Sequence, residues 1–120
     1  MYIGKLSKLT GASPKAIRHY EDIGLLPNVE RSGSYRIYKD EHIVFITMIK
    51  RAQTLGFKLA DIVPVVQAKY QNWRFPLKLS TQLIDKKRKE IQDQIAKAQT
   101  LDDELTKLSK ELNLVFSDDT

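Results

Sequence analysis

The sequence contains no cysteine, and it has only two histidines, His19 and His42, among its 120 residues. The lack of cysteine excludes disulfide bonds, thiolate metal sites and redox-sensing thiols. The two histidines form no ligand cluster, so we expect no metal and no cofactor. There is also no nucleophile–base set, no carboxylate pair and no phosphate-binding glycine loop, so we do not expect an enzyme.

Long apolar runs are also absent. No stretch of about 18 apolar residues occurs, which predicts no membrane span. The first ten residues, MYIGKLSKLT, lack the apolar core of a signal peptide. We therefore expect a cytoplasmic protein.

The positive charge is concentrated in the first half of the chain. Residues 1–60 hold ten Lys and Arg against five Asp and Glu, whereas residues 61–120 hold ten of each, so the net charge of +5 belongs to the first half. This split favours a nucleic-acid-binding module joined to a second, neutral element. A mildly basic soluble domain with no such partner is the alternative. The length suits one modest domain with an appended helix.

Residues 13–27, SPKAIRHYEDIGLLP, are the stretch around which the first half is organised. Ser13 and Pro14 are typical of a helix start, and Gly24 is typical of a helix end. An inward apolar stripe is expected at helical spacing, formed by Ala16, Ile17, Tyr20 and Ile23. The polar residues left facing outward are Lys15, Arg18, His19, Glu21 and Asp22. Such a helix suits a DNA groove, although an ordinary amphipathic surface helix would look similar.

A second short helix precedes this one. Residues 2–10 place Ile3, Leu6 and Leu9 on one face, and Gly11-Ala12-Ser13 forms a tight turn before the next helix. Two short helices joined by a three-residue turn containing glycine indicate a helix-turn-helix.

Residues 30–39, ERSGSYRIYK, predict a small β-hairpin with its turn at Ser32-Gly33-Ser34. Alternation puts Arg36 and Tyr38 on one face of the second strand. Together with Arg31 they could reach a phosphate backbone, which makes the hairpin a candidate wing. The alternative is a plain surface hairpin.

Two further helices follow the hairpin. Asp40 is expected to cap the first, which runs to about residue 55 with Ile43, Ile46 and Ile49 toward the core. The second covers residues 59–68, and Pro64 should either kink it or delay its start by one turn. Lys58, between the two helices, could contact a phosphate.

Residues 70–79 read as an aromatic junction containing Tyr70, Trp73 and Phe75. Core or interface packing is the favoured use of these side chains, with a small ligand pocket as the alternative.

A long helix is expected over residues 80–113, followed by a frayed tail over residues 114–120. Apolar residues recur at heptad spacing, and the predicted dimerisation residues are Ile84, Ile91, Ala98, Leu101, Leu105, Leu108 and Leu112. A helix of about 30 residues would extend roughly 45 Å, too far for a small domain to bury. The stripe therefore favours a homodimer over a helix folded back on its own chain.

Several segments together resemble the MerR family of transcriptional regulators. They occur in order over about residues 1–68 and comprise Ile3-Gly4-Lys5-Leu6, Thr10-Gly11-Ala12-Ser13, Ile17-Arg18-His19-Tyr20-Glu21, Gly24-Leu25-Leu26-Pro27, Tyr35-Arg36-Ile37-Tyr38, Leu55-Gly56-Phe57-Lys58-Leu59 and Asp61-Ile62. The resemblance implies a mainly α fold, in which a winged helix-turn-helix domain (residues 1–69) precedes a long antiparallel coiled-coil dimerisation helix. It also implies a dimer that binds a pseudo-palindromic promoter operator in double-stranded DNA and distorts it for RNA polymerase.

The candidate DNA-binding residues come from the second helix, the wing and the later connector. They are Lys15, Arg18, His19, Tyr20, Arg31, Tyr35, Arg36, Tyr38 and Lys58. By resemblance, Arg18, His19 and Tyr20 match DNA-contacting positions of the second helix. Inducer binding near the aromatic junction and control without a small molecule both stay open.

Two other functions are compatible with the same sequence. An architectural DNA-binding factor, similar to an excisionase, would bend DNA without engaging polymerase. A protein-interaction adaptor would use the long helix as a scaffold without binding DNA, although the charge split argues against it.

Overall fold

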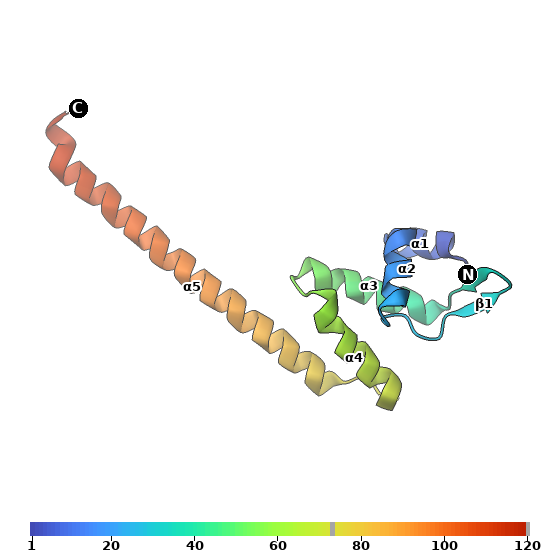
Figure 1. Ribbon diagram of the computed structural model, residues 1–120. Coiled ribbons are helices and arrows are strands. Elements are labelled where there is room, and N and C mark those ends of the chain that lie inside the picture. Colours follow the sequence, from blue (N-terminus) through green and yellow to red (C-terminus); the bar gives the residue numbers. More distant parts are fainter. Residues whose placement is uncertain (73, 120) are drawn as a thin grey trace. The chain divides into compact units, whose positions relative to one another are not determined.

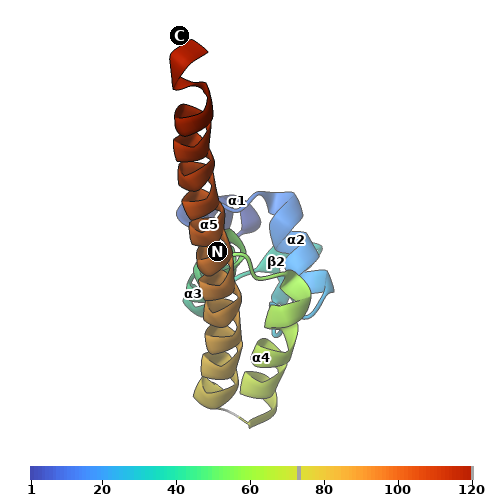
Figure 2. The same ribbon diagram turned by 90° about the vertical axis from the view of Figure 1, so that its left-hand side faces the viewer.

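The computed structural model describes residues 1–72 and 74–119, which divide into two compact units, residues 1–76 and residues 77–120 (Figure 1). The first unit contains four helices and one hairpin within its described residues, and the second contains one long helix and a short 3₁₀ turn. In the first unit α1 packs on both α2 and α3, and α3 contacts α4 (Figure 2).

The predicted helix-turn-helix is confirmed. α1 spans Ile3–Thr10 and α2 spans Pro14–Asp22, and Gly11 between them has a φ of 75°, which a glycine adopts without steric cost. Ser13 caps α2, because its Oγ accepts a hydrogen bond from the Ala16 N–H at 3.1 Å. Of the apolar residues expected on one face of α1, Leu6 is fully buried, whereas Leu9 is 54% exposed.

The hairpin is also confirmed. β1 (Glu30–Ser32) pairs antiparallel with β2 (Tyr35–Ile37), so that Arg31 lies opposite Arg36. Beyond β2, the Tyr38 N–H donates to the Met1 carbonyl at 2.7 Å, and the Met1 amine donates to the Tyr38 carbonyl at 2.7 Å. These two bonds join the end of the hairpin to the start of the chain.

Helix α3 (Asp40–Thr54) begins differently from the prediction. Lys39, not Asp40, is the N-cap residue, and Asp40 is the first helical residue. The side chain that satisfies this helix start is His42, whose Nδ1 accepts the Lys39 N–H at 2.9 Å. His42 is fully buried, and its Nε2 lies 3.4 Å from the Pro27 carbonyl oxygen, an arrangement that fits a neutral ring protonated at Nε2.

Helix α4 (Leu59–Asn72) includes Pro64 without interruption. It starts at Leu59 and continues past residue 68, so of the two alternatives predicted for Pro64, a kink or a start one turn later, the later start is wrong. Its start is secured by Asp61, whose Oδ2 accepts the Lys58 N–H at 3.0 Å.

The core of the first unit is built from all of these elements except the strands. Its buried apolar residues are Leu6, Ala12, Ile17, Tyr20, Leu25, Leu26, Tyr38, Ile46, Ile49 and Val66. The inward stripe predicted for α2 is therefore confirmed, with Ala16 and Ile23 packed at the edge of the core.

Helix α5 (Leu77–Phe116) is longer at both ends than the sequence predicted, and Ser117–Asp119 follow as a 3₁₀ turn. The residues expected to form the frayed tail are thus helical as far as Phe116. None of the 40 residues of α5 is buried. The predicted dimerisation side chains are all exposed, including Ile91 at 42% and Leu101 at 66%. No helix in the described part of the chain combines the length and the apolar character that a membrane span requires.

Candidate nucleic-acid interface

The outer face of α2 carries the basic residues that the sequence predicted. Lys15, Arg18 and His19 are exposed, while Ile17 and Tyr20 on the opposite face are buried. This separation follows from the 3.6-residue period of the helix. The arrangement leaves a cationic helix surface that can lie along a polyanion.

Tyr20 secures α2 rather than facing outward. Its ring is buried, and its hydroxyl donates a hydrogen bond to Gln53 Oε1 on α3 at 2.9 Å. Burial raises the pKa of Tyr20 above its ordinary value of 10.0. The predicted DNA contact by Tyr20 is thus confined to what its hydroxyl can offer, and Gln53 is a supporting residue that the sequence analysis missed.

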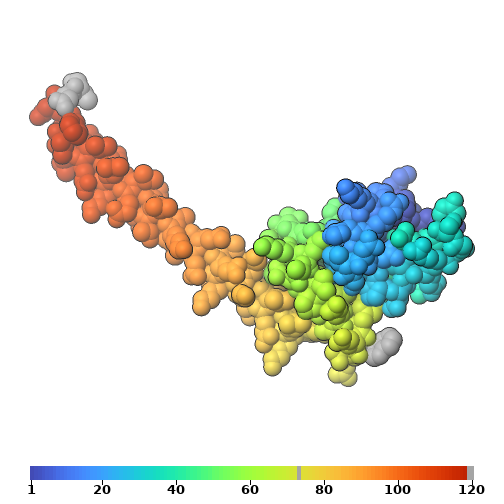
Figure 3. Space-filling model, viewed as in Figure 1, coloured from blue at the N-terminus to red at the C-terminus, as the bar shows by residue number. Residues whose placement is uncertain are grey.

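The wing presents two of its predicted residues to solvent. Arg31 and Tyr35 are exposed on the hairpin, and the Tyr35 ring lies 5.8 Å from the ring of Tyr2. The surfaces of α2 and of the hairpin adjoin one another in the space-filling view (Figure 3). Helix and wing therefore offer one continuous surface.

Arg36 is tied to α2 by an ion pair. Its Nε lies 2.6 Å from Oε2 of Glu21, and both side chains are largely buried. The expectation that Glu21 faces outward is therefore wrong. No periodicity in the sequence links Glu21 with Arg36, because the two residues are 15 positions apart and belong to different elements.

Tyr38 does not lie on the exposed face of the wing. The residue is 1% exposed, because the chain turns into the core after β2 and brings the ring 5.8 Å from that of His42. Burial raises the pKa of Tyr38, and the Glu21 charge raises it further, while Arg36, Arg18 and Arg31 lower it. The structure thus differs from the expectation of a phosphate contact by Tyr38, and we leave this residue out of the proposed contacts.

A shallow cleft lies where the start of α1, α2 and the hairpin meet. Its volume is about 140 Å³, and it is lined by Tyr2, Ile3, Arg18, Ser34, Tyr35 and Arg36. Two guanidinium groups and three hydroxyl groups thus surround a space open to solvent. Tyr2 and Ser34 were not predicted as site residues, because only the fold brings them beside Arg18.

Lys58 is exposed in the connector between α3 and α4, as expected for a second phosphate contact. Lys58 is not among the residues that line the cleft, which come from the start of α1, from α2 and from the hairpin. Lys58 therefore belongs to a separate part of the first unit's surface.

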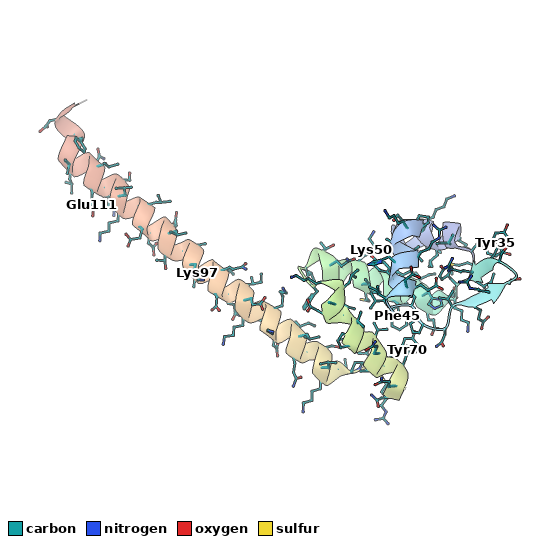
Figure 4. The ribbon with its side chains drawn as sticks, in the orientation of Figure 1. Tyr35, Phe45, Lys50, Tyr70, Lys97 and Glu111 are labelled. Carbon is teal, nitrogen blue, oxygen red and sulfur yellow. The ribbon has the colours of Figure 1, made fainter. Side chains whose placement is uncertain are left out.

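Two residues of the predicted aromatic junction, Tyr70 and Phe75, lie within the described residues. Tyr70 lies on α4 with its ring 5.9 Å from that of Phe45 on α3, and Lys69 Nζ lies 4.4 Å from the centre of the Phe45 ring (Figure 4). Burial, followed by the charge of Glu41, raises the pKa of Tyr70. Phe75 is exposed, and Trp73 lies outside the described residues. Tyr70 thus serves to pack α4 on α3.

Comparisons with known protein families match most of the chain. Residues 1–69 match the family described as "MerR HTH family regulatory protein", and residues 45–108 match the family described as "MerR, DNA binding".

Metal-ligand clusters of three or more His, Cys, Asp or Glu are absent from the part of the chain that the structure describes.

Individual curated proteins show the same likeness. The regulator HmrR of Sinorhizobium medicae (strain WSM419) is 46% identical over 63 residues, which are 52% of this chain and 43% of HmrR. The regulator CueR of Salmonella typhimurium (strain LT2) is 30% identical over 111 residues, which are 92% of this chain and 80% of CueR. The match thus spans less than half the length of HmrR.

Solved structures share the fold. The transcription regulator PbrR691 from Ralstonia metallidurans CH34, solved in complex with lead(II), has a TM-score of 0.69 at 24% identity, covering 92% of this chain and 86% of that one. HiNmlR, a MerR family regulator lacking the sensor domain and bound to promoter DNA, has a TM-score of 0.65 at 23% identity, covering 98% and 86%.

Proposed function

Because the chain belongs to the MerR family of helix-turn-helix regulatory proteins, we propose that it is a dimeric, sequence-specific DNA-binding transcriptional regulator. The observation that carries this proposal is that α2 exposes basic side chains beside the wing, with Arg18 of α2 and Arg36 of the wing lining one cleft. Lys15, Arg18 and His19 would enter the major groove, with Arg31, Tyr35 and Arg36 on the flanking backbone. Lys58 would add a separate phosphate contact.

The dimer rests on α5. Its 40 residues extend about 60 Å as a helix, and its heptad stripe of apolar side chains has no cover within the helix itself. Pairing with the same helix of a second copy would bury that stripe. In an antiparallel pair the two N-terminal ends of α5, each joined to its own DNA-binding unit, lie at opposite ends of the rod.

Two-fold symmetry determines the kind of DNA that such a dimer recognises. Each half-site meets the same protein surface, so the operator is pseudo-palindromic. We propose that the bound dimer distorts a promoter, with the contacts of helix and wing offsetting a deformation cost of a few kcal/mol up to roughly ten. RNA polymerase would then engage the distorted promoter. In this proposal the protein acts in the cytoplasm and catalyses no reaction.

Footprinting of the purified full-length chain tests this function. The proposal predicts protection of a symmetric site in genomic promoter fragments, and changed transcript levels when polymerase is added to the same fragments in vitro. Symmetric protection with unchanged transcription would instead support an architectural DNA-binding factor. An absence of any preferred site would contradict sequence-specific regulation.

A further inference from the structure

Glu21 and Arg36 connect the two parts of the candidate interface. Glu21 lies in the last turn of α2, and Arg36 is the central residue of β2. Their 2.6 Å contact is the shortest ion pair among the described residues. The pair therefore fixes the wing relative to the helix that carries Arg18.

The contact uses a particular atom of Arg36. Glu21 Oε2 meets the inner nitrogen, Nε, of a planar guanidinium group. The contact is an ion pair, since neither Glu21 Oε2 nor Arg36 Nε has a hydrogen-bond partner among the described residues. Because the guanidinium group is planar and rigid, an ion pair at Nε still limits where the two outer nitrogens, Nη1 and Nη2, can lie. Within the described residues Arg36 has this ion pair and no other, so its outer nitrogens remain available to a ligand.

The space beside this guanidinium suits an anion. Arg36 and Arg18 both line the 140 Å³ cleft, together with the hydroxyl-bearing Ser34. The charges of Arg18, Arg31 and Arg36 lower the pKa of Tyr38, whereas that of Glu21 raises it. Arg18 and Arg36 both line the cleft and Glu21 pairs with Arg36 alone, which leaves positive charge at the cleft for a phosphate.

We propose that Glu21 is a positioning residue for DNA binding, holding the Arg36 guanidinium so that its outer nitrogens donate to one backbone phosphodiester group in the cleft. This inference rests on the proposed function, because it specifies how the wing grips DNA. Glu21 itself does not touch the phosphate. It acts through Arg36, as an outer carboxylate orients a ligand-binding group.

The inference makes a prediction whose sign is unusual. Removal of a negative charge near DNA should tighten binding if Glu21 acts only through its charge. If Glu21 positions Arg36, its neutralisation should weaken binding, because the guanidinium is no longer held toward the phosphate. Glu21→Gln keeps the side-chain size and separates these two effects.

The full-length chain is first used to select duplexes from a random-sequence library. Binding of the selected duplex, and of a scrambled duplex of equal composition, is then measured by fluorescence anisotropy over a range of NaCl concentrations. We expect Glu21→Gln to bind the selected duplex about tenfold more weakly, the scale of one charge-assisted contact. The slope of the logarithm of the binding constant against the logarithm of the NaCl concentration should also become shallower by about 0.9, as for one lost phosphate contact.

Asp22→Asn is the matched control. Asp22 is the next residue of α2, carries the same charge and is exposed. Its neutralisation should leave the salt dependence unchanged and should leave binding equal or tighter. Weakening by Asp22→Asn equal to that by Glu21→Gln would overturn a specific role for Glu21.

A double variant tests whether Glu21 acts through Arg36. Arg36→Gln should weaken binding at least as much as Glu21→Gln, and adding Glu21→Gln to it should produce no further loss. Equal or tighter binding by Glu21→Gln alone, or a further loss in the Arg36→Gln background, would overturn the inference.

If circular dichroism shows that Glu21→Gln is unfolded, Arg36→Lys takes its place, since lysine keeps the charge beside Glu21 but lacks the outer nitrogens. Unchanged affinity and salt dependence in Arg36→Lys would overturn the inference.

The behaviour of the wild type separates this inference from the proposed function. If the wild type selects no sequence, sequence-specific regulation fails, while the salt dependence of binding to a random-sequence duplex still tests Glu21. If the wild type binds no duplex, both proposals fail.

Discussion

Ten apolar side chains are buried in the described residues of the first unit, whereas α5 buries none of its 40 residues. The first unit closes its core by joining distant segments, as when Tyr20 on α2 reaches Gln53 on α3. The apolar stripe of helix α5 is exposed along the helix. The first unit can therefore fold by its own contacts, while α5 needs a second surface for its stripe.

The largest effect is expected where the stripe of α5 is broken. Leu105→Asp places a charge on the proposed seam, so we expect loss of the dimer and loss of tight DNA binding. Sedimentation equilibrium measures the mass of the particle. Thr106→Asp introduces a charge of the same sign one residue away, off the stripe, and should remain dimeric. A dimeric Leu105→Asp would show that the assumed heptad register is wrong.

The next largest effect is expected in the core of the first unit. Ile46 is fully buried, so Ile46→Ala should lower the free energy of unfolding by about 2–5 kcal/mol. Urea unfolding followed by near-ultraviolet circular dichroism measures this, since all five tyrosines lie in this unit. Met48→Ala, on the exposed side of the same helix, should cost about 0.5 kcal/mol or less. Equal losses in both variants would contradict the described core.

A smaller effect is expected for one DNA-contacting side chain. Arg18→Ala should weaken binding to a preferred duplex by about 1–3 kcal/mol and reduce discrimination against a scrambled one. Lys86→Ala removes the same charge from α5 and should change neither quantity by that amount. Both variants should keep the oligomeric state of the wild type, as measured by sedimentation equilibrium. Equal losses of discrimination would argue against sequence reading by α2.

The smallest effect for a single side chain is expected in alkali. Burial raises the pKa of Tyr20, Tyr38 and Tyr70 above 10.0, so the folded unit holds these protons where the unfolded chain releases them. The stability that these protons confer is complete below pH 10 and is lost as the pH rises through the raised pKa values.

Between pH 10 and 11 the loss should be at most about 1.4 kcal/mol for each of these tyrosines. Urea unfolding at several pH values measures it. Tyr70→Phe should reduce the loss, and its cost at neutral pH should be small, because the Tyr70 hydroxyl is buried without a hydrogen-bond partner among the described residues. Helix α5 contains no tyrosine, so tyrosine deprotonation should not change its own stability between pH 10 and 11. A pH-independent stability across this range would contradict the burial of these hydroxyls.

Local signals in the sequence were sufficient for the helix-turn-helix and the hairpin. Ser13, Pro14 and Gly33 act on their immediate neighbours, so their effects could be predicted without knowledge of the fold. The exposed basic face of α2 followed from helical periodicity in the same way.

Contacts between distant segments could not be predicted in this manner. The pairing of Glu21 with Arg36, the burial of Tyr38 and the use of His42 in place of Asp40 at the start of α3 all depend on how the elements pack. Pro64 left two alternatives open for α4, and the start of the helix at Leu59 could be decided only from the fold, in which Val66 of the same helix is buried in the core.

The exposed apolar stripe of α5 also has a consequence for the cell. With the dimer as the working form, the share of chains that can grip an operator rises with the number of copies made. Dilution at cell division would then return some chains to monomers whose α5 exposes its apolar stripe, a kind of surface that chaperones and proteases recognise. Gene dosage would in this way become part of the control that the protein exerts.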